Sequence, residues 1–225
     1  MKKPAKGLKD NQILNNAQKI FLNAFTRSEL KDVYRLSGGT ALSAFYLEHR
    51  WSEDLDFFSS ERVRLFKIEE FMKSLEFVDN ILFTKVFDRN IFKLTLADSN
   101  ILKVEFTYYP RKNIEPPFIV DSLQIDSFLD VLVNKICAIA DRFDAKDYID
   151  IYWALSYERM SLLKLIEYAE KKCEIKGIKH ILKSRLLQIP EGIEGLQLRS
   201  KINRHDIEKL FQKCVKEIIR KEIRK

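Results

Sequence analysis

The chain has 225 residues, of which 46% are hydrophobic and 32% are charged, and its net charge is +7. This length supports one large hydrophobic core or two modest ones, and the composition excludes a disordered or low-complexity protein. The first ten residues are basic and polar with no apolar run behind them, so we expect neither a secretory signal nor a membrane span. We therefore expect a cytoplasmic protein with no membrane partner.

The cysteines do not suggest a covalent or metal framework. Cys137, Cys173 and Cys214 are far apart and odd in number, and no Cys-x-x-Cys spacing occurs. This usage is typical of a reducing compartment and argues against both a disulfide framework and a zinc site. The three histidines are equally scattered.

Hydrophobic periodicity predicts a mixture of helices and strands in the first half of the chain. Three consecutive β-rich runs are separated by Asp-Arg-Asn and Asp-Ser-Asn, which are typical turn sequences of antiparallel hairpins. The expected helices are 11–25, 40–49 and 65–77, and the expected strands are 33–36, 55–58, 81–87, 91–97 and 101–108.

After residue 120 the pattern becomes helical, following three prolines between 110 and 117. The helices expected here are 127–143, 145–156, 162–173 and 202–223. We therefore predict an α+β fold with two domains. Residues 1–120 would form a small mixed β-sheet flanked by helices, and residues 121–225 a helical domain that completes the active-site cleft.

Two aspartates one residue apart, Asp54 and Asp56, follow a Gly-Gly turn. On a strand the side-chain period is two, so both carboxylates project from one face, as a clamp for a hard divalent cation would require. The turn itself, Gly38 and Gly39 followed by Thr40, offers bare backbone N–H groups to a phosphate chain.

A third acid, Glu105, lies between Val104 and Phe106 on a strand whose alternation indicates partial burial. It points away from the core and must meet either solvent or a cation. If the Glu105 strand pairs beside the Asp54 strand, three carboxylates come together, which is enough to hold one or two Mg²⁺ ions. A lone acid of this kind is usually an exposed strand residue; the joint pattern of glycine turn, Asp-x-Asp and later acid favours a metal site.

A second polar group is predicted on the helices 127–143 and 145–156. Lys135 and Arg142 share a flank of the first helix, while Asp147 and Asp150 share the inner face of the second. A buried carboxylate needs a partner, and Lys135 or Lys146 could supply it. The pair would then be either a structural ion pair or part of the active site.

The positive charge is concentrated at the C-terminal end. Residues 171–225 carry 16 Lys and Arg against 7 Asp and Glu. Such a segment could follow a nucleic-acid backbone, or it could be the solvated face of amphipathic helices, and the two readings carry about equal weight.

Two blocks of sequence carry a family resemblance. The segment from Leu36 to Leu42, together with 45–58, closely resembles nucleotidyltransferases of the AbiEii/AbiGii toxin type, a branch of the polymerase-β-like superfamily. The segments 135–142 and 146–152 are similar to the later motifs of the same family. The resemblance covers roughly residues 34–156.

The resemblance implies a role for each matching residue. Gly38, Gly39 and Thr40 would hold a nucleoside triphosphate, with Lys135 beside it. The catalytic residues would be four acids: Asp54, Asp56, Glu105 and Asp147. The first three would bind Mg²⁺, with Mn²⁺ as an alternative. One departure is the third acid, which is more often Asp in such proteins.

The implied activity is transfer of a nucleoside monophosphate from an NTP to an acceptor hydroxyl, by the toxin of a toxin–antitoxin or abortive-infection system. The acceptor would be RNA, such as a tRNA 3′ end, and a cognate antitoxin would be the protein partner. Alternatives are nucleotidylation of a small molecule such as an aminoglycoside, and a non-catalytic toxin that binds GTP or another NTP. The surplus positive charge disfavours a polycationic substrate.

Overall fold

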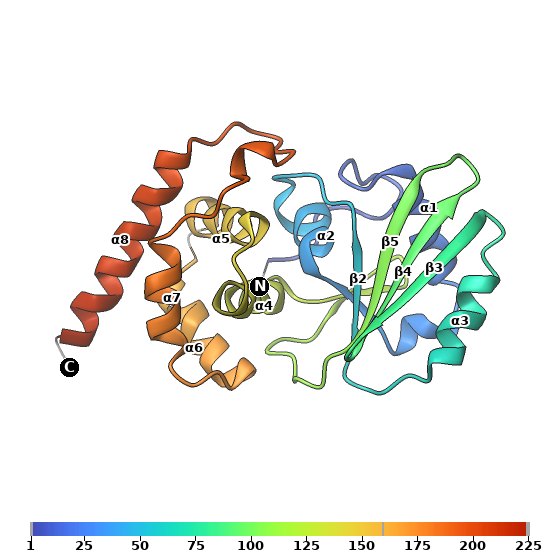
Figure 1. Cartoon of the computed structure of the whole chain (residues 1–225), viewed down its shortest axis with the longest axis horizontal. Helices are drawn as coiled ribbons and strands as arrows, with labels where there is room; N and C mark the ends of the chain where they lie inside the picture. Colours follow the sequence, from blue (N-terminus) through green and yellow to red (C-terminus); the bar gives the residue numbers. More distant parts are fainter. Residues whose placement is uncertain (1, 159, 224–225) are drawn as a thin grey trace. The chain divides into compact units, whose positions relative to one another are not determined.

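The computed structural model describes residues 2–158 and 160–223 (Figure 1). The chain divides into two compact units, Met1–Phe128 and Leu129–Lys225. The first unit thus continues beyond residue 120, where the sequence placed the domain boundary. The reason is the short strand β7 (Leu123–Ile125), which pairs with β1 (Arg35–Ser37) and belongs to the sheet of the first unit.

The first unit is built on a mixed seven-stranded sheet with the order β3-β4-β5-β2-β1-β7-β6. β2 is parallel to β5, and β1 is parallel to β7, while the other neighbours are antiparallel. This confirms the predicted mixed sheet, followed by helices. The remaining strands are β2 (Leu55–Ser59), β3 (Val78–Val86), β4 (Arg89–Leu96), β5 (Ile101–Tyr108) and β6 (Phe118–Val120).

One face of the sheet forms the core of this unit. Helix α1 (Asn16–Phe25) begins with a capping box at Asn15 and contributes Phe25, whose ring centroid lies 4.2 Å from that of Phe57 on β2. Phe57 in turn stacks on Phe106 of β5 at 5.1 Å. Helix α3 (Leu65–Lys73) adds Phe71, with an edge contact to Phe25. This aromatic cluster fixes which side of β2 and β5 faces inward.

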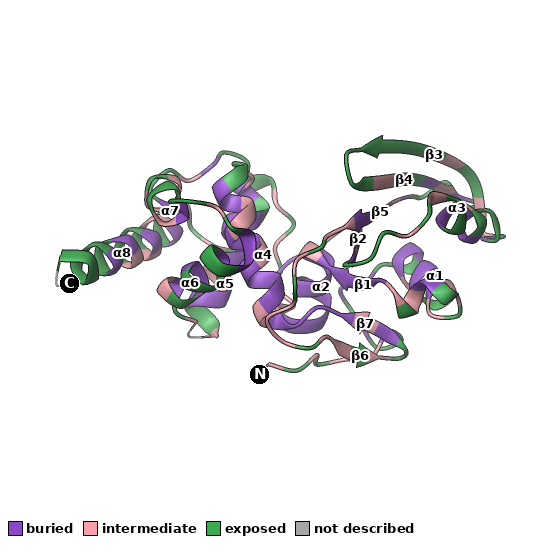
Figure 2. Ribbon diagram, turned by 90° about the horizontal axis from the view of Figure 1, so that it is seen from below, coloured by how far each residue is buried: buried purple, intermediate pink, exposed green. Residues whose placement is uncertain are grey.

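The other face of the sheet carries the polar side chains. Along β2, Leu55 and Phe57 are fully buried whereas Asp56 between them is partly exposed, as alternation on a strand requires. Figure 2 shows that β3, at the edge of the sheet, is mostly exposed. This confirms the strand predicted at 55–58, and Asp54 lies directly before it.

The helix predicted at 40–49 is shorter and less regular than expected. It consists of α2 (Gly38–Leu42) and a single π-helical turn, η2 (Ser43–Leu47). Glu48 then adopts a left-handed backbone with φ 51°, which ends the element. The chain therefore turns sharply and returns through residues 50–54 to β2.

The second unit is helical. Its core contains Tyr148 and Phe211, whose rings meet edge to face at 5.9 Å. No helix in the described ranges is long and apolar enough to cross a membrane. The helices are α4 (Phe128–Asp141, which starts at the boundary), α5 (Ala145–Tyr157), α6 (Leu162–Cys173), α7 (Ile178–Leu186) and α8 (Arg204–Ile223).

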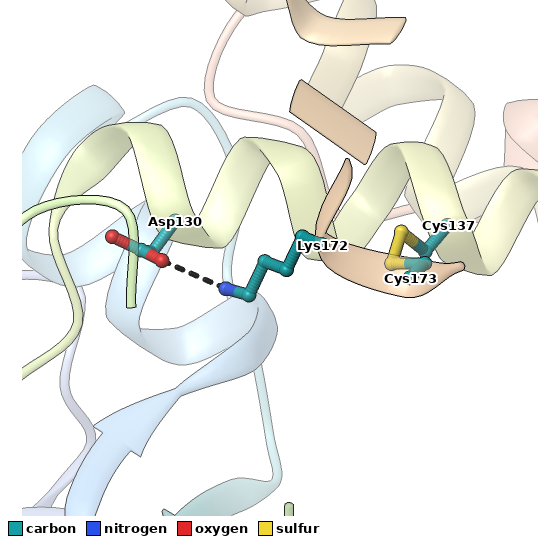
Figure 3. The surroundings of a disulfide bond; sticks show 4 residues. All are labelled: Asp130, Cys137, Lys172 and Cys173. Carbon is teal, nitrogen blue, oxygen red and sulfur yellow. Dashed lines mark hydrogen bonds and ion pairs between the residues drawn. A yellow bond between two sulfur atoms is a disulfide. The ribbon is translucent and has the colours of Figure 1, made fainter. Parts of the chain in front are cut away.

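A disulfide joins Cys137 of α4 to Cys173 at the end of α6, with 6.5 Å between their Cα atoms (Figure 3). The expectation that the cysteines would stay unpaired was wrong, because helix packing brings together two residues 36 positions apart. Cys214 is a free thiol. Next to the disulfide, the buried Lys172 forms an ion pair with the fully buried Asp130 at 2.7 Å, a second link between α4 and α6.

Candidate active site

The glycine turn and the first strand carboxylate lie directly against each other. β1 and β2 are antiparallel, with Ser37 opposite Asp56, so α2 starts beside the Asp56 carboxylate. Gly38 has φ +67°, and a Cβ added there would overlap the Asp56 Oδ2 atom. Only glycine allows both this backbone conformation and this close approach.

The next two residues of the turn contact the segment that leads into β2. A Cβ on Gly39 would collide with the guanidinium of Arg50 and would lie 3.1 Å from Ser52 Oγ. The buried Thr40 donates its hydroxyl hydrogen to the backbone carbonyl of Asp54. The structure thus brings Gly38, Gly39 and Thr40 together with the aspartate motif, while their predicted contact with a triphosphate remains a prediction.

Asp54 faces a lysine that the sequence analysis did not consider. Lys103 Nζ lies 2.8 Å from Asp54 Oδ2. Burial alone would lower the pKa of Lys103, but the hydrogen bond to Asp54 and the negative fields of Asp54, Asp56 and Glu105 outweigh burial, so the pKa is raised. One ammonium group therefore lies within the field of all three predicted metal ligands.

Glu105 occupies the predicted side of the sheet. In the parallel β2–β5 pair it is directly opposite Asp56, so the two side chains share a face. As expected for an acid that points away from the core, it meets a cation: Arg89 Nε and Nη2 donate to its two oxygens at 2.5 and 2.6 Å. Thr107 adds a hydrogen bond at 2.8 Å. Burial alone would raise the pKa of Glu105; Arg89, Thr107 and Lys103 outweigh burial and lower it.

The fit of this face to Mg²⁺ follows from these partners. Asp56 on β2 and Asp54 directly before it both act on Lys103, and carboxylate oxygens are the ligands a hard divalent ion needs. Glu105 is held at both oxygens by its partners. Within residues 2–158 and 160–223, no group of three or more His, Cys, Asp or Glu side chains is arranged to hold a metal ion. The carboxylate chemistry of the two aspartates suits Mg²⁺, Lys103 is the present partner of Asp54, and metal binding by Asp54, Asp56 and Glu105 remains a prediction.

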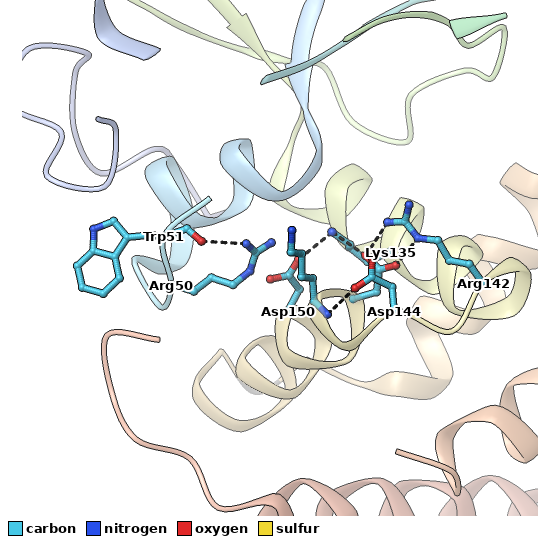
Figure 4. A network of polar contacts seen from close by, with 8 residues as sticks. Arg50, Trp51, Lys135, Arg142, Asp144 and Asp150 are labelled. Atoms are coloured by element: carbon cyan, nitrogen blue, oxygen red, sulfur yellow. Dashed lines mark hydrogen bonds and ion pairs between the residues drawn. The ribbon is translucent and has the colours of Figure 1, made fainter. Parts of the chain in front are cut away.

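The predicted Lys135 group is present within the helical unit (Figure 4). Lys135 Nζ lies 2.7 Å from Asp147 Oδ1 and 2.8 Å from Asp150 Oδ2, and all three residues are buried. Arg142 Nε donates to Asp147 Oδ2 at 2.8 Å. Burial alone would raise the pKa of Asp147, but Lys135 and Arg142 outweigh it and lower the pKa. The pairing of Lys135 with both aspartates links α4 to α5. That Lys135 and Asp147 also line the active site remains a prediction.

Comparison with known proteins decides the family. A model of the AbiEii family, described as nucleotidyl transferase AbiEii toxin of a type IV toxin–antitoxin system, matches residues 20–224. The chain belongs to the AbiEii nucleotidyltransferase toxin family. This confirms the resemblance read from the sequence and the assignment to nucleotidyltransferase enzymes.

Two solved structures share the AbiEii-family fold. JHP933 from Helicobacter pylori superimposes with a TM-score of 0.59 at 18% identity, over 92% of this chain and 94% of that one. A candidate nucleotidyltransferase from H. pylori gives a TM-score of 0.60 at 18% identity, over 92% and 98% of the two chains. A search of curated protein sequences finds no match.

Two cations of this AbiEii-family chain, Lys103 and Arg89, were not among the predicted site residues. Lys103 stands two residues before Glu105 and therefore on the same face, a signal the strand period could have given. Arg89 was read as part of a turn, although it is the first residue of β4 and lies opposite Thr107. Its partner could only be identified once the register of the β4–β5 pair was known.

Gly38→Ala tests the contact between the glycine turn and Asp56 of β2. The added Cβ would occupy the position of the Asp56 carboxylate in a left-handed backbone, so we expect unfolding to become easier by about 1–2 kcal/mol. Nucleotidyl transfer should fall further than stability accounts for, since Asp56 is displaced. Urea unfolding and turnover at a temperature where the variant is folded measure the two effects. Gly195→Ala, which meets no atom within 4 Å, is the control; equal behaviour of the two variants would refute the contact.

Proposed function

We propose that this AbiEii-family chain transfers a nucleoside monophosphate from an NTP to a hydroxyl at the 3′ end of an RNA, such as a tRNA, and that this modification is its toxic activity. Membership of the family makes an NTP the substrate and a cognate antitoxin the partner. The observation that carries the proposal is the contact between the Gly38 turn and the Asp56 carboxylate, which would place a phosphate site and a metal site side by side.

In this reaction the acceptor oxygen attacks the α-phosphorus of the NTP, a new P–O bond forms, and the bond to the β-phosphate oxygen breaks. Pyrophosphate leaves with the bonding electron pair, and the proton of the acceptor hydroxyl passes to a carboxylate or to water. Mg²⁺, when bound, supplies positive charge against the triphosphate and the leaving pyrophosphate. Asp54 and Asp56 would hold it, and Glu105 would help to activate the hydroxyl.

The backbone N–H groups of Gly38, Gly39 and Thr40 would bind the triphosphate. The two glycines have no side chain that would keep a phosphate away from these groups. Lys135 and Asp147 are proposed as further site residues from the helical unit. The surplus positive charge of the chain, +7 overall, favours an anionic acceptor such as RNA over a polycationic drug.

The proposal is tested by incubating the full chain with total tRNA, Mg²⁺ and each of the four α-labelled NTPs. We expect label in RNA with at least one nucleotide, release of pyrophosphate, and loss of both on addition of EDTA. A γ-labelled NTP is the control and should not label RNA. If none of the four α-labelled nucleotides labels RNA, the RNA acceptor is wrong. If toxicity persists in the Asp56→Asn variant, toxicity by NTP sequestration is favoured over toxicity by catalysis.

A further inference from the structure

Lys103 contacts one of the two proposed metal ligands in the way a bound cation would. Its Nζ atom lies 2.8 Å from Asp54 Oδ2. Asp56 and Glu105 also act electrostatically on this ammonium. One positive charge thus lies in the combined field of the three acids, against a carboxylate that is proposed to bind Mg²⁺. An ammonium and a divalent ion cannot both lie against that carboxylate, because like charges repel strongly at such short range.

The register of the sheet explains why this lysine reaches the site. On β5, Lys103 precedes Glu105 by two residues, so both side chains leave the same face of the strand. β2 is parallel to β5, and Asp56 lies opposite Glu105. Two residues earlier along both segments, the same register brings Asp54 level with Lys103. The ion pair therefore follows from the strand pairing itself.

The two ion pairs of this face differ in how firmly their cations are held. Arg89 donates from two nitrogens to both oxygens of the buried Glu105, at 2.5 and 2.6 Å. Lys103 contacts one oxygen of Asp54, and the two side chains are 39% and 37% exposed. A lysine ammonium is compact, strongly hydrated and carried on a flexible chain, so it can move into water without opening the core. The pair at Asp54 can therefore exchange its cation more easily than the pair at Glu105.

The backbone of Asp54 is anchored independently of Lys103. The hydroxyl of the buried Thr40 donates to the backbone carbonyl of Asp54. Thr40 belongs to the glycine turn, whose first residue lies against the Asp56 carboxylate. Departure of the ammonium would therefore release the Asp54 carboxylate without moving the segment that positions it.

We infer that Lys103 is the resident counter-ion of the metal site. It neutralises Asp54 when no divalent ion is bound, and it gives way when one binds. The inference rests on the proposed function, because it takes Asp54 and Asp56 as the ligands of Mg²⁺. Lys103 is then a positioning residue that holds the Asp54 carboxylate between turnovers. Because the ion must displace the ammonium, the chain binds metal more weakly than the same carboxylates would without Lys103.

Binding of Mn²⁺ to the full chain without nucleotide tests the inference, with the free ion measured by electron paramagnetic resonance. Lys103→Met removes the competing charge, so we expect Mn²⁺ to bind at least about ten-fold more tightly. Lys103→Arg keeps the charge and should stay within about three-fold of the natural chain. The matched control is Lys93→Met, because Lys93 is exposed and lies directly opposite Lys103 in the β4–β5 pair. The affinity of this control should change by less than about two-fold.

Two results would overturn the role of Lys103. An equal gain in affinity in Lys93→Met and Lys103→Met would mean that only the net charge of the sheet matters. A Lys103→Met variant that binds Mn²⁺ no more tightly than the natural chain, whatever its melting temperature, would mean that the lysine does not compete with the ion. Tighter binding in Lys103→Met together with unchanged binding in Lys103→Arg supports the exchange.

Asp56→Asn separates failure of this inference from failure of the proposed function. If Asp56→Asn in the Lys103→Met background keeps the tightened Mn²⁺ binding, the ion is held elsewhere, and both the metal site and the role of Lys103 are wrong. If neither the natural chain nor Lys103→Met binds Mn²⁺, the inference is wrong. Transfer of α-label to tRNA by the natural chain would in that case leave the proposed function standing.

Discussion

Asp56→Asn should reduce nucleotidyl transfer by about a thousand-fold or more while the protein remains folded. The substitution keeps the shape of the side chain and removes the charge that a divalent ion requires. Loss of metal-based charge stabilisation is worth several kcal/mol in the transition state, and each 1.4 kcal/mol corresponds to about a ten-fold change in rate. Transfer of α-label to tRNA under Mg²⁺ measures the effect.

The control for this variant is Asp79→Asn, which makes the same chemical change at an exposed position of β3. It should retain the activity of the natural chain. Thermal unfolding of both variants should be close to that of the natural chain, because the Asp56 side chain is only partly buried. Activity of Asp56→Asn within ten-fold of the natural chain would mean that this carboxylate does not take part in the reaction.

Lys135→Met should make the helical unit easier to unfold by about 3–5 kcal/mol. The ammonium of Lys135 is held by the fully buried Asp147 and Asp150, and its removal leaves buried carboxylates with too little positive charge. Arg142 still offsets part of the charge on Asp147. Urea unfolding followed by circular dichroism measures the loss, and Lys209→Met, at an exposed position of α8, is the control.

The pH dependence of the same variant has a definite sign. Because the pKa of Asp147 is lowered in the folded protein, its ionised form adds stability above the ordinary aspartate pKa. That contribution is lost as the pH falls through the lowered value. The stability difference between the natural chain and Lys135→Met should therefore be large at neutral pH and smaller near pH 3. A difference that is the same at both values would contradict the ion-pair account.

Much of the site could be predicted because its signals are local in sequence. A period of two placed Asp54 and Asp56 on one face, and Glu105 between two buried residues had to meet solvent or a cation. Helical periodicity likewise turned Asp147 and Asp150 inward and left Lys135 or Lys146 as their partner, and the structure pairs both aspartates with Lys135. Each of these inferences needs only the backbone geometry of one or two elements.

What could not be predicted depends on pairing between distant segments. The strands β6 and β7 have three residues each and are too short to show alternation. Their place in the sheet became clear only from the pairing seen in the structure. The Cys137–Cys173 bond depends on how α4 packs against α6, and spacing in sequence does not give this. The partnership of Arg89 with Glu105 similarly depends on strand register.

The central claim is that Asp54 and Asp56 bind the metal of a nucleotide whose triphosphate is held by the glycine turn. A crystal structure of the chain with Mn²⁺ and a non-hydrolysable NTP tests it most directly, since anomalous scattering locates the ion. We predict an ion within coordination distance of both aspartates, with the triphosphate at the backbone N–H groups of residues 38–40. A nucleotide bound elsewhere, with neither aspartate in contact with the ion, would contradict the account.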